Sequence, residues 1–201
     1  MKKEFLPYDV VRNNALKLAH KIYNDGFIPD VIYVSLRGGA YMGNVISEYF
    51  KIVRKGERPV YYAAVVARSY TDVGSFERVS VDGWTYSPEH LRNGDKVLII
   101  DDIFDTGRTV NHLTNIILEK GIPRNDVKVA VHDYKFFYDK PTQLLIQPDY
   151  WARMQRLSVN DPPFWIHYLS HELDGLAEKE LKENYYKNDP ELEEVLKVLK
   201  F

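Results

Sequence analysis

Two adjacent carboxylates, Asp101 and Asp102, follow an apolar run of four residues, 97–100. A short β-branched run of this kind is typical of a strand buried on both faces, so the acids are expected at the carboxyl end of such a strand. Carboxylates in that position could meet a diol or a hydrated Mg²⁺ ion. Because unused acids beside a buried strand are costly, the pair indicates a binding site.

A short loop rich in hydroxyl groups follows the acids and leads into an expected helix. The loop, residues 105–109, reads Asp-Thr-Gly-Arg-Thr. Backbone N–H groups at a helix start, supplemented by hydroxyl groups, bind phosphate. Neither the Walker A spacing nor a glycine-rich dinucleotide-binding loop is present. The loop therefore predicts a phosphate-bearing ligand of another class.

Together, residues 97–109 resemble the signature with which type I phosphoribosyltransferases bind phosphoribosyl pyrophosphate. That signature is an apolar strand, two acids, two variable residues and Asp-Thr-Gly-x-Thr. The resemblance implies that Asp101 and Asp102 hold the ribose hydroxyls and influence Mg²⁺, while residues 105–109 wrap the 5′-phosphate. It also implies that Asp105 lies next to a purine base and acts on N7.

The segment 35–39, Ser-Leu-Arg-Gly-Gly, resembles the pyrophosphate loop of the same family. In that family the loop binds pyrophosphate through backbone amides and a basic side chain, here Arg37. The peptide bond between Leu36 and Arg37 is accordingly expected to be cis. The donor-binding residues that the resemblance implies are Arg37, Gly38, Gly39, Asp101, Asp102, Asp105, Thr106, Gly107, Arg108 and Thr109.

A Ser-Tyr pair and a lysine make the sequence similar to the hypoxanthine-guanine (xanthine) branch of the family. Ser69 and Tyr70 resemble the pair in a mobile loop, or lid, that closes over the reaction centre. Lys135, which follows the valine-rich segment 127–131, resembles the lysine that donates to purine O6. Lys140, the first residue of a Lys-Pro pair, is the alternative, and Asp133 would instead suit the amino group of adenine.

The resemblance extends loosely beyond residue 147. Trp165 and Ile166 resemble the hood pair that stacks on the base and meets it with backbone groups. Glu172 occupies the approximate place of an acid that coordinates Mg²⁺. The implied base-binding residues are thus Lys135, Trp165 and Ile166, and the implied metal ligands are Asp101, Asp102 and Glu172.

The implied function is a purine salvage enzyme that transfers 5-phosphoribosyl from phosphoribosyl pyrophosphate to N9 of a 6-oxopurine. Pyrophosphate and a nucleoside monophosphate are the products, Mg²⁺ is the cofactor, and Asp105 and Arg37 are the catalytic residues. Two alternatives stay open. One is an adenine phosphoribosyltransferase on the same scaffold, and the other is a non-catalytic, nucleotide-sensing regulator.

These residues require an α/β fold whose parallel strands end at one edge of a sheet. The expected strands are Val31–Ser35, Val60–Ala67, Val97–Ile100, Val127–Val131 and Leu144–Gln147. The expected helices are Tyr8–Tyr23, Met42–Phe50, Val110–Glu119, Glu172–Asn184 and Pro190–Lys200. We expect a type I phosphoribosyltransferase core over residues 1–147, with a mobile loop at about 68–92, and a small hood with C-terminal helices over 148–201.

The composition agrees with a globular enzyme. The 201 residues carry a formal net charge of −2 and include no cysteine, which fits an intracellular chain. The balance of charge predicts no affinity for nucleic acid, and the longest apolar run, of eight residues, is too short to cross a membrane. We expect a cytoplasmic homodimer or homotetramer.

Overall fold

The computed structural model describes residues 2–71, 77–139 and 144–199, with only the backbone described at 68–71 and 77–78. The chain divides into two compact units. The larger unit is Val11–Asp161, and the smaller one combines Met1–Val10 with Pro162–Phe201. The predicted domain boundary at residue 147 stays a prediction.

A six-stranded sheet with the order β4-β3-β2-β5-β6-β7 forms the centre of the larger unit. Five neighbouring strands are parallel, and β4 pairs with β3 in the antiparallel sense at one edge. The α/β fold with a mostly parallel sheet is therefore confirmed. The strands are β2 (Val31–Leu36), β3 (Tyr61–Thr71), β4 (Glu77–Trp84), β5 (Val97–Phe104), β6 (Val127–Phe137) and β7 (Tyr150–Leu157).

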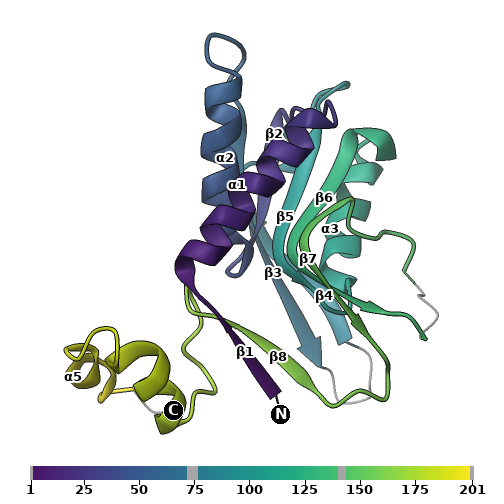
Figure 1. Ribbon diagram of the computed structural model, residues 1–201. Coiled ribbons are helices and arrows are strands. Elements are labelled where there is room, and N and C mark those ends of the chain that lie inside the picture. The colour runs from purple at the N-terminus through teal and green to yellow at the C-terminus, as the bar shows by residue number, and fades with distance from the viewer. Residues whose placement is uncertain (1, 72–76, 140–143, 200–201) are drawn as a thin grey trace. The chain divides into compact units, whose positions relative to one another are not determined.

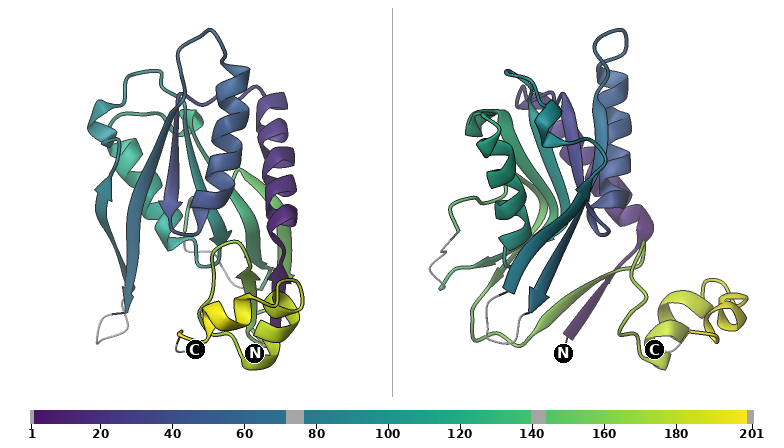
Figure 2. Two further views of the ribbon diagram at one scale, coloured as in Figure 1. Left: turned by 90° about the vertical axis from the view of Figure 1, so that its left-hand side faces the viewer. Right: turned by 180° about the vertical axis from the view of Figure 1, so that it is seen from behind.

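Helices cover both faces of this sheet, as Figures 1 and 2 show. The helices α1 (Tyr8–Asn24) and α2 (Gly39–Val53) lie on one face, and α3 (Arg108–Glu119) lies on the other. Two short 3-10 helices, η1 (Pro88–His90) and η2 (Arg124–Asp126), lie in connections. The apolar stripe predicted for α1 is buried as expected: Val11, Ala15, Leu18, Ala19 and Ile22.

Strand register brings the predicted site segments to the same edge of the sheet. In the parallel pair β2 and β5, Val34 lies opposite Ile100. The segment after β2 and the acids late in β5 therefore lie near one another at the carboxyl ends of the strands. In open α/β sheets this edge is where ligands bind.

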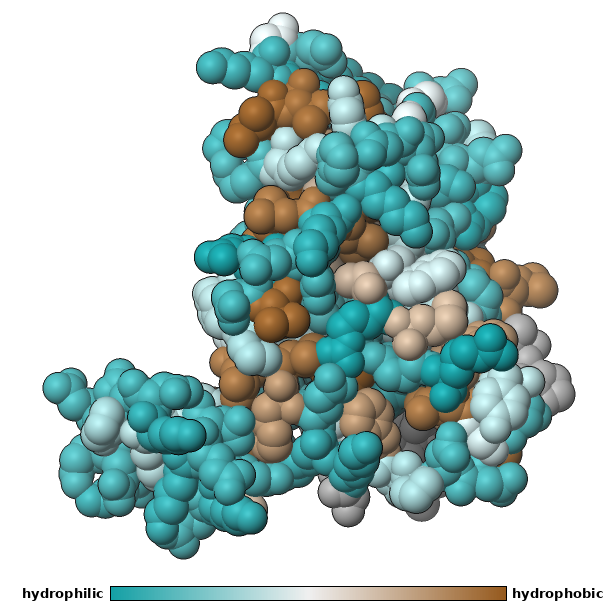
Figure 3. Space-filling view, viewed as in Figure 1, coloured by the Kyte–Doolittle hydropathy of each residue, from teal (hydrophilic) through white to brown (hydrophobic). Residues whose placement is uncertain are grey.

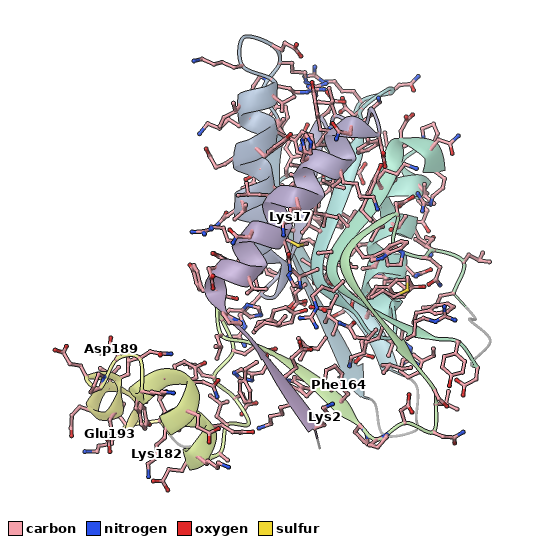
Figure 4. The ribbon with its side chains drawn as sticks, in the orientation of Figure 1. Lys2, Lys17, Phe164, Lys182, Asp189 and Glu193 are labelled. Atoms are coloured by element: carbon pink, nitrogen blue, oxygen red, sulfur yellow. The ribbon has the colours of Figure 1, made fainter. Side chains whose placement is uncertain are left out.

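The smaller unit contains a two-stranded parallel sheet of β1 (Lys2–Leu6) and β8 (Phe164–Tyr168), neither of which was predicted. Lys2 and Phe164, both labelled in Figure 4, are paired residues of these two strands. The Nζ atom of Lys2 lies 6.0 Å from the centroid of the Phe164 ring. The C-terminal helices are shorter than expected: α4 (Glu178–Leu181), η3 (Lys182–Tyr186) and α5 (Leu192–Leu196). They enclose a small cluster of Leu176, Leu181 and Leu196.

Two expectations about secondary structure are wrong. Residues 144–147 form no strand, because the Ile146 backbone bonds to the Asn111 side chain on α3 in place of a neighbouring strand. Residues 68–92 are not one long loop, because β3 continues to Thr71 and β4 pairs back against it. The mobility of this segment stays a prediction.

No helix in the described ranges is long and apolar enough to cross a membrane. On the larger unit, Figure 3 shows a mostly hydrophilic face with hydrophobic patches between the hydrophilic residues.

Candidate active site

The segment after β2 packs directly on the end of β5. Its Leu36–Arg37 peptide bond is cis, which confirms the expectation from the sequence. A Cβ atom at Gly38 would lie 2.2 Å from Oδ2 of Asp102, and one at Gly39 would lie 2.6 Å from the carbonyl oxygen of Ile100. Only glycine permits so close an approach, so the loop and the acidic strand end form one structure.

The two acids at this strand end hold each other in an electrostatically unfavourable position. The Asp102 N–H donates to Oδ1 of Asp101 at 3.1 Å, and the Ile103 N–H donates to Oδ1 of Asp102 at 2.9 Å. Burial and the charge of Asp102 raise the pKa of Asp101 well above its ordinary value, although a hydrogen bond from Ser35 acts in the opposite direction. A cation or the hydroxyls of a diol would stabilise the charged pair.

The loop between β5 and α3 is held from below by two side chains. Gly107 precedes α3 with φ +76°, and a Cβ atom there would lie 2.2 Å from the ring of Phe104. Asn111 is buried, and its Nδ2 donates to the Gly107 carbonyl at 3.0 Å. Thr106 and Arg108 are exposed above this support. The loop thus leads into a twelve-residue helix whose first turn is accessible to solvent. An anion can bind at such a helix start.

An ion pair joins the ends of β5 and β6. Nζ of Lys135 lies 3.0 Å from Oδ2 of Asp105. The lysine is 8% exposed, whereas the Asp105 side chain is 48% exposed. A partly open pair of this kind presents a hydrogen-bond donor and an acceptor side by side.

Asp133, two residues before the lysine, is fully buried and already engaged through both carboxylate oxygens. Its Oδ2 lies 2.7 Å from Nδ1 of His132. Its Oδ1 accepts from Nε2 of Gln155 at 2.6 Å and lies 3.2 Å from Nε of Arg153. The network continues to α1, where Nδ2 of Asn14 lies 3.2 Å from Nε2 of His132. Asp133 is therefore unsuited to bind an amino group of a base.

Most predicted site residues lie at the carboxyl edge of the larger unit, although their roles stay predictions. These are Arg37, Gly38, Gly39, Asp101, Asp102, Asp105, Thr106, Gly107, Arg108, Thr109 and Lys135. The remaining three, Trp165, Ile166 and Glu172, belong to the smaller unit.

The structure describes the residues predicted for the hood and the lid only in part. Trp165 is 44% exposed, and Oε2 of Glu172 accepts from the Tyr168 N–H at 3.0 Å. The backbone at Ser69 and Tyr70 pairs with β4, and nothing is described of their side chains. Lys140 lies outside the described residues.

Two residues that support the site were not predicted from the sequence. Ser35 belongs to the predicted pyrophosphate loop, but its hydrogen bond to Asp101 depends on the neighbouring strand. Asn111 occupies the buried stripe of α3 together with Val110 and Leu113. A polar residue on a buried stripe, which also includes Thr114, was the signal that could have revealed it.

Comparison with known proteins agrees with this geometry. The sequence model of the phosphoribosyl transferase domain matches residues 8–159. No match was found among the curated proteins.

Solved structures with a similar fold include three at low sequence identity. A purine phosphoribosyltransferase from Pyrococcus horikoshii has a TM-score of 0.65 and 21% identity, over 88% of this chain and 99% of its own. A hypothetical protein from Neisseria gonorrhoeae with bound ppGpp has a TM-score of 0.61 and 21% identity, over 86% of this chain and 91% of its own. The Helicobacter pylori xanthine-guanine-hypoxanthine phosphoribosyltransferase has a TM-score of 0.55 and 18% identity, over 90% and 99%. The strand order, the acidic end of β5 and the loop 105–109 agree with this domain match over residues 8–159. The chain therefore belongs to the phosphoribosyl transferase domain family.

Proposed function

We propose that the protein is a purine salvage enzyme that transfers 5-phosphoribosyl from phosphoribosyl pyrophosphate to N9 of a 6-oxopurine. The observation that carries the proposal is the ion pair of Asp105 and Lys135, 3.0 Å apart, next to the phosphate loop. The proposal includes the expected cytoplasmic location and the expected homodimeric or homotetrameric state.

The polarity of this pair favours a 6-oxopurine over adenine. A lysine ammonium has three donors and no acceptor, so Lys135 can pair with a carbonyl at C6 but meets an amino group donor to donor. Asp105 accepts from the proton at N7, which lies on the same edge of the base. Asp133, the acceptor that would have suited adenine, has both oxygens engaged.

The donor would bind along the edge from β2 to α3. Asp101 and Asp102 would hold the ribose hydroxyls, and residues 105–109 would hold the 5′-phosphate at the start of α3. Arg37 and the backbone amides of Gly38 and Gly39 would meet the pyrophosphate. These fixed donors stabilise the charge that develops on the leaving group.

The acidic pair also fits the Mg²⁺ that the family implies. Carboxylate oxygens are the ligands that Mg²⁺ prefers, and the raised pKa of Asp101 indicates that a nearby positive charge would stabilise the pair. When bound, the metal helps to neutralise the pyrophosphate. Glu172 is the third ligand that the family resemblance implies.

Transfer requires cleavage of the C1′–O bond through an oxocarbenium-like state while the base attacks through N9. Asp105 accepts the N7 proton, which makes N9 the better nucleophile. Water must be kept from C1′, or the donor is hydrolysed. We propose that the segment carrying Ser69 and Tyr70 closes as a lid, and that Trp165 and Ile166 cover the base.

The test compares wild type with Lys135→Ala by kcat/KM for hypoxanthine, guanine, xanthine and adenine. Wild type is expected to prefer the 6-oxopurines, and the variant to lose most of that preference, because such hydrogen bonds discriminate by up to ~10⁴-fold. Lys128→Ala is the matched control, since Lys128 lies on the same strand but pairs with Asp149 at 3.3 Å near its start.

Three outcomes of this test would count against the proposal. A wild-type preference for adenine would support the adenine enzyme. Donor binding with no turnover of any base would support a nucleotide-sensing regulator. An unaffected Lys135→Ala variant would move the contact with O6 to Lys140.

A further inference from the structure

We infer that Gln155 is a third base-binding residue and that its side-chain carbonyl accepts the N1–H of a 6-oxopurine. The inference rests on the proposed function, because it requires the base to lie against Asp105 and Lys135. It assigns a specificity role to a strand, β7, from which the sequence analysis drew no site residue.

Gln155 lies next to the proposed base-binding pair. Gln155 lies directly opposite Lys135 in the parallel pair of β6 and β7. Side chains of paired residues share a face of the sheet and are near neighbours. Lys135 in turn reaches Asp105 at the end of β5. The three side chains therefore follow the order of three adjacent strands, with the lysine in the middle.

The Gln155 amide is oriented by its hydrogen bond to Asp133. Its Nε2 donates to Oδ1 of Asp133 at 2.6 Å. The Nε–H of Arg153 lies 3.2 Å from the same oxygen, so two N–H donors meet this one carboxylate acceptor. The amino side of the amide must therefore face Asp133, and the oxygen Oε1 is turned away from it. The chemistry of the partner decides this assignment.

Within the part of the chain that the structure describes, the side-chain oxygen of Gln155 has no hydrogen-bond donor. Oε1 of Gln155 is buried and has no hydrogen-bond partner among the residues that the structure describes. A buried acceptor without a donor is unfavourable, and most such groups in native proteins are satisfied. Gln155 as a whole is half-buried, but Oε1 itself is covered in the ligand-free chain, so a base reaches this oxygen only after the groups that cover it move. A ligand that brings a donor to Oε1 would remove the deficit.

The resulting row reads acceptor, donor, acceptor across β5, β6 and β7. A 6-oxopurine protonated at N7 presents the complementary order along one edge: the N7–H donor, the O6 acceptor and the N1–H donor. Adenine presents an amino donor at C6 and an acceptor at N1, so it opposes both Lys135 and Gln155. Two mismatches exclude adenine more strongly than one.

The test is Gln155→Leu, which keeps the approximate size and removes both hydrogen-bonding groups. We expect kcat/KM for hypoxanthine and guanine to fall about tenfold or more, with kcat/KM for adenine unchanged or higher. If Gln155 only positioned Asp133, all bases would lose alike, and that result would overturn the inference. Gln147→Leu is the matched control, because Gln147 accepts from the Tyr134 hydroxyl at 2.7 Å; its base selectivity should stay that of wild type.

Wild type supplies a second measurement that does not depend on the folding of the variant. 6-Methoxypurine keeps an oxygen at C6 but has no N1–H, so it should compete with hypoxanthine at least about tenfold more weakly than guanine does. Equal competition would overturn the inference. If wild type prefers 6-oxopurines and depends on Lys135 while Gln155→Leu keeps full selectivity, this inference alone fails. If wild type prefers adenine, the proposed function fails as well.

Discussion

Two pairs of aspartates lie at opposite edges of the same sheet, one just before β2 and β5 begin and the other late in β5, and their surroundings differ. At the amino ends, Asp30 precedes β2 and Asp95 precedes β5. Arg54 lies 2.9 Å from Asp30, and Arg58 lies 2.6 Å from Asp95. Burial alone would raise the pKa of Asp95, but hydrogen bonds from Arg58 and the Arg92 N–H lower it below its ordinary value.

At the carboxyl end the direction is reversed, because burial and the charge of Asp102 raise the pKa of Asp101. One residue type thus serves two purposes in one sheet. The amino-end pair is neutralised by the protein itself and stabilises the fold. The carboxyl-end pair is left in a state that a ligand would improve, which is typical of functional sites.

The largest expected effect comes from breaking one ion pair at each edge of the sheet, Asp105–Lys135 at the carboxyl edge and Asp95–Arg58 at the amino edge. Asp105→Asn should lower kcat about 10²- to 10⁴-fold, because the amide keeps the shape but cannot accept the proton. Asp95→Asn should leave kcat nearly unchanged and lower the free energy of unfolding by about 2 kcal/mol, because Arg58 loses a partner that is 2% exposed. Single-turnover kinetics and urea unfolding measure the two effects. Full turnover by Asp105→Asn would refute its assigned role.

Two glycines with positive φ provide the next comparison. Gly107→Ala should destabilise the protein by about 3 kcal/mol, because the left-handed backbone (φ +76°) is joined by a clash at 2.2 Å with the ring of Phe104. Gly94→Ala, just before Asp95, should cost only about 1 kcal/mol, because φ is +88° but no atom lies within 4 Å of the added carbon. Equal losses in thermal unfolding would show that the support beneath the phosphate loop is not tightly packed.

Removal of a charge from the site should raise stability by a smaller amount. Asp101→Asn should increase the free energy of unfolding at neutral pH by about 1 kcal/mol, because the unfavourable charge is gone. Urea unfolding of the ligand-free protein measures the change. A loss of stability as large as that of Asp95→Asn would mean that both aspartate pairs are structural.

The difference in free energy of unfolding between Asp101→Asn and wild type should vanish at acidic pH. Since the pKa of Asp101 is raised in the folded state, acidification through that pKa toward the ordinary value of about 3.9 stabilises wild type relative to Asp101→Asn. For Asp95, whose pKa is lowered, the advantage of wild type over Asp95→Asn is present above the ordinary value and is lost as the pH falls through the folded pKa. Urea unfolding over a pH series measures the free energy of unfolding of wild type and each variant. As the pH falls, the excess stability of Asp101→Asn over wild type should shrink, and so should the excess stability of wild type over Asp95→Asn. A constant Asp101 difference would contradict this account.

The parts of the site that could be predicted from the sequence are those contained in one short segment. Residues 97–109 carry the strand, the acids, the loop and the helix start in order, so local patterns are sufficient. Lys135 could be placed because it lies near the end of the neighbouring strand β6.

The missed features depend on contacts between distant segments. The pairing of β1 with β8 joins residues about 160 positions apart, and short strands of this kind have little local signal. Residues 144–147 have the composition of a strand, yet Asn111 takes the backbone bonds of Ile146. The engagement of Asp133 requires three residues from β6 and β7, so its availability could not be judged from its neighbours in sequence.

The central claim, that the carboxyl-end aspartates bind the donor and the amino-end ones do not, is tested most directly by calorimetric titration with phosphoribosyl pyrophosphate and Mg²⁺. Wild type, Asp101→Asn and Asp95→Asn are compared at a temperature where all three are folded. We predict that Asp101→Asn binds about tenfold or more weakly, because hydrogen bonds to a charged group are lost, and that Asp95→Asn binds like wild type. Unchanged affinity of Asp101→Asn, or an equal loss in both variants, would contradict the account.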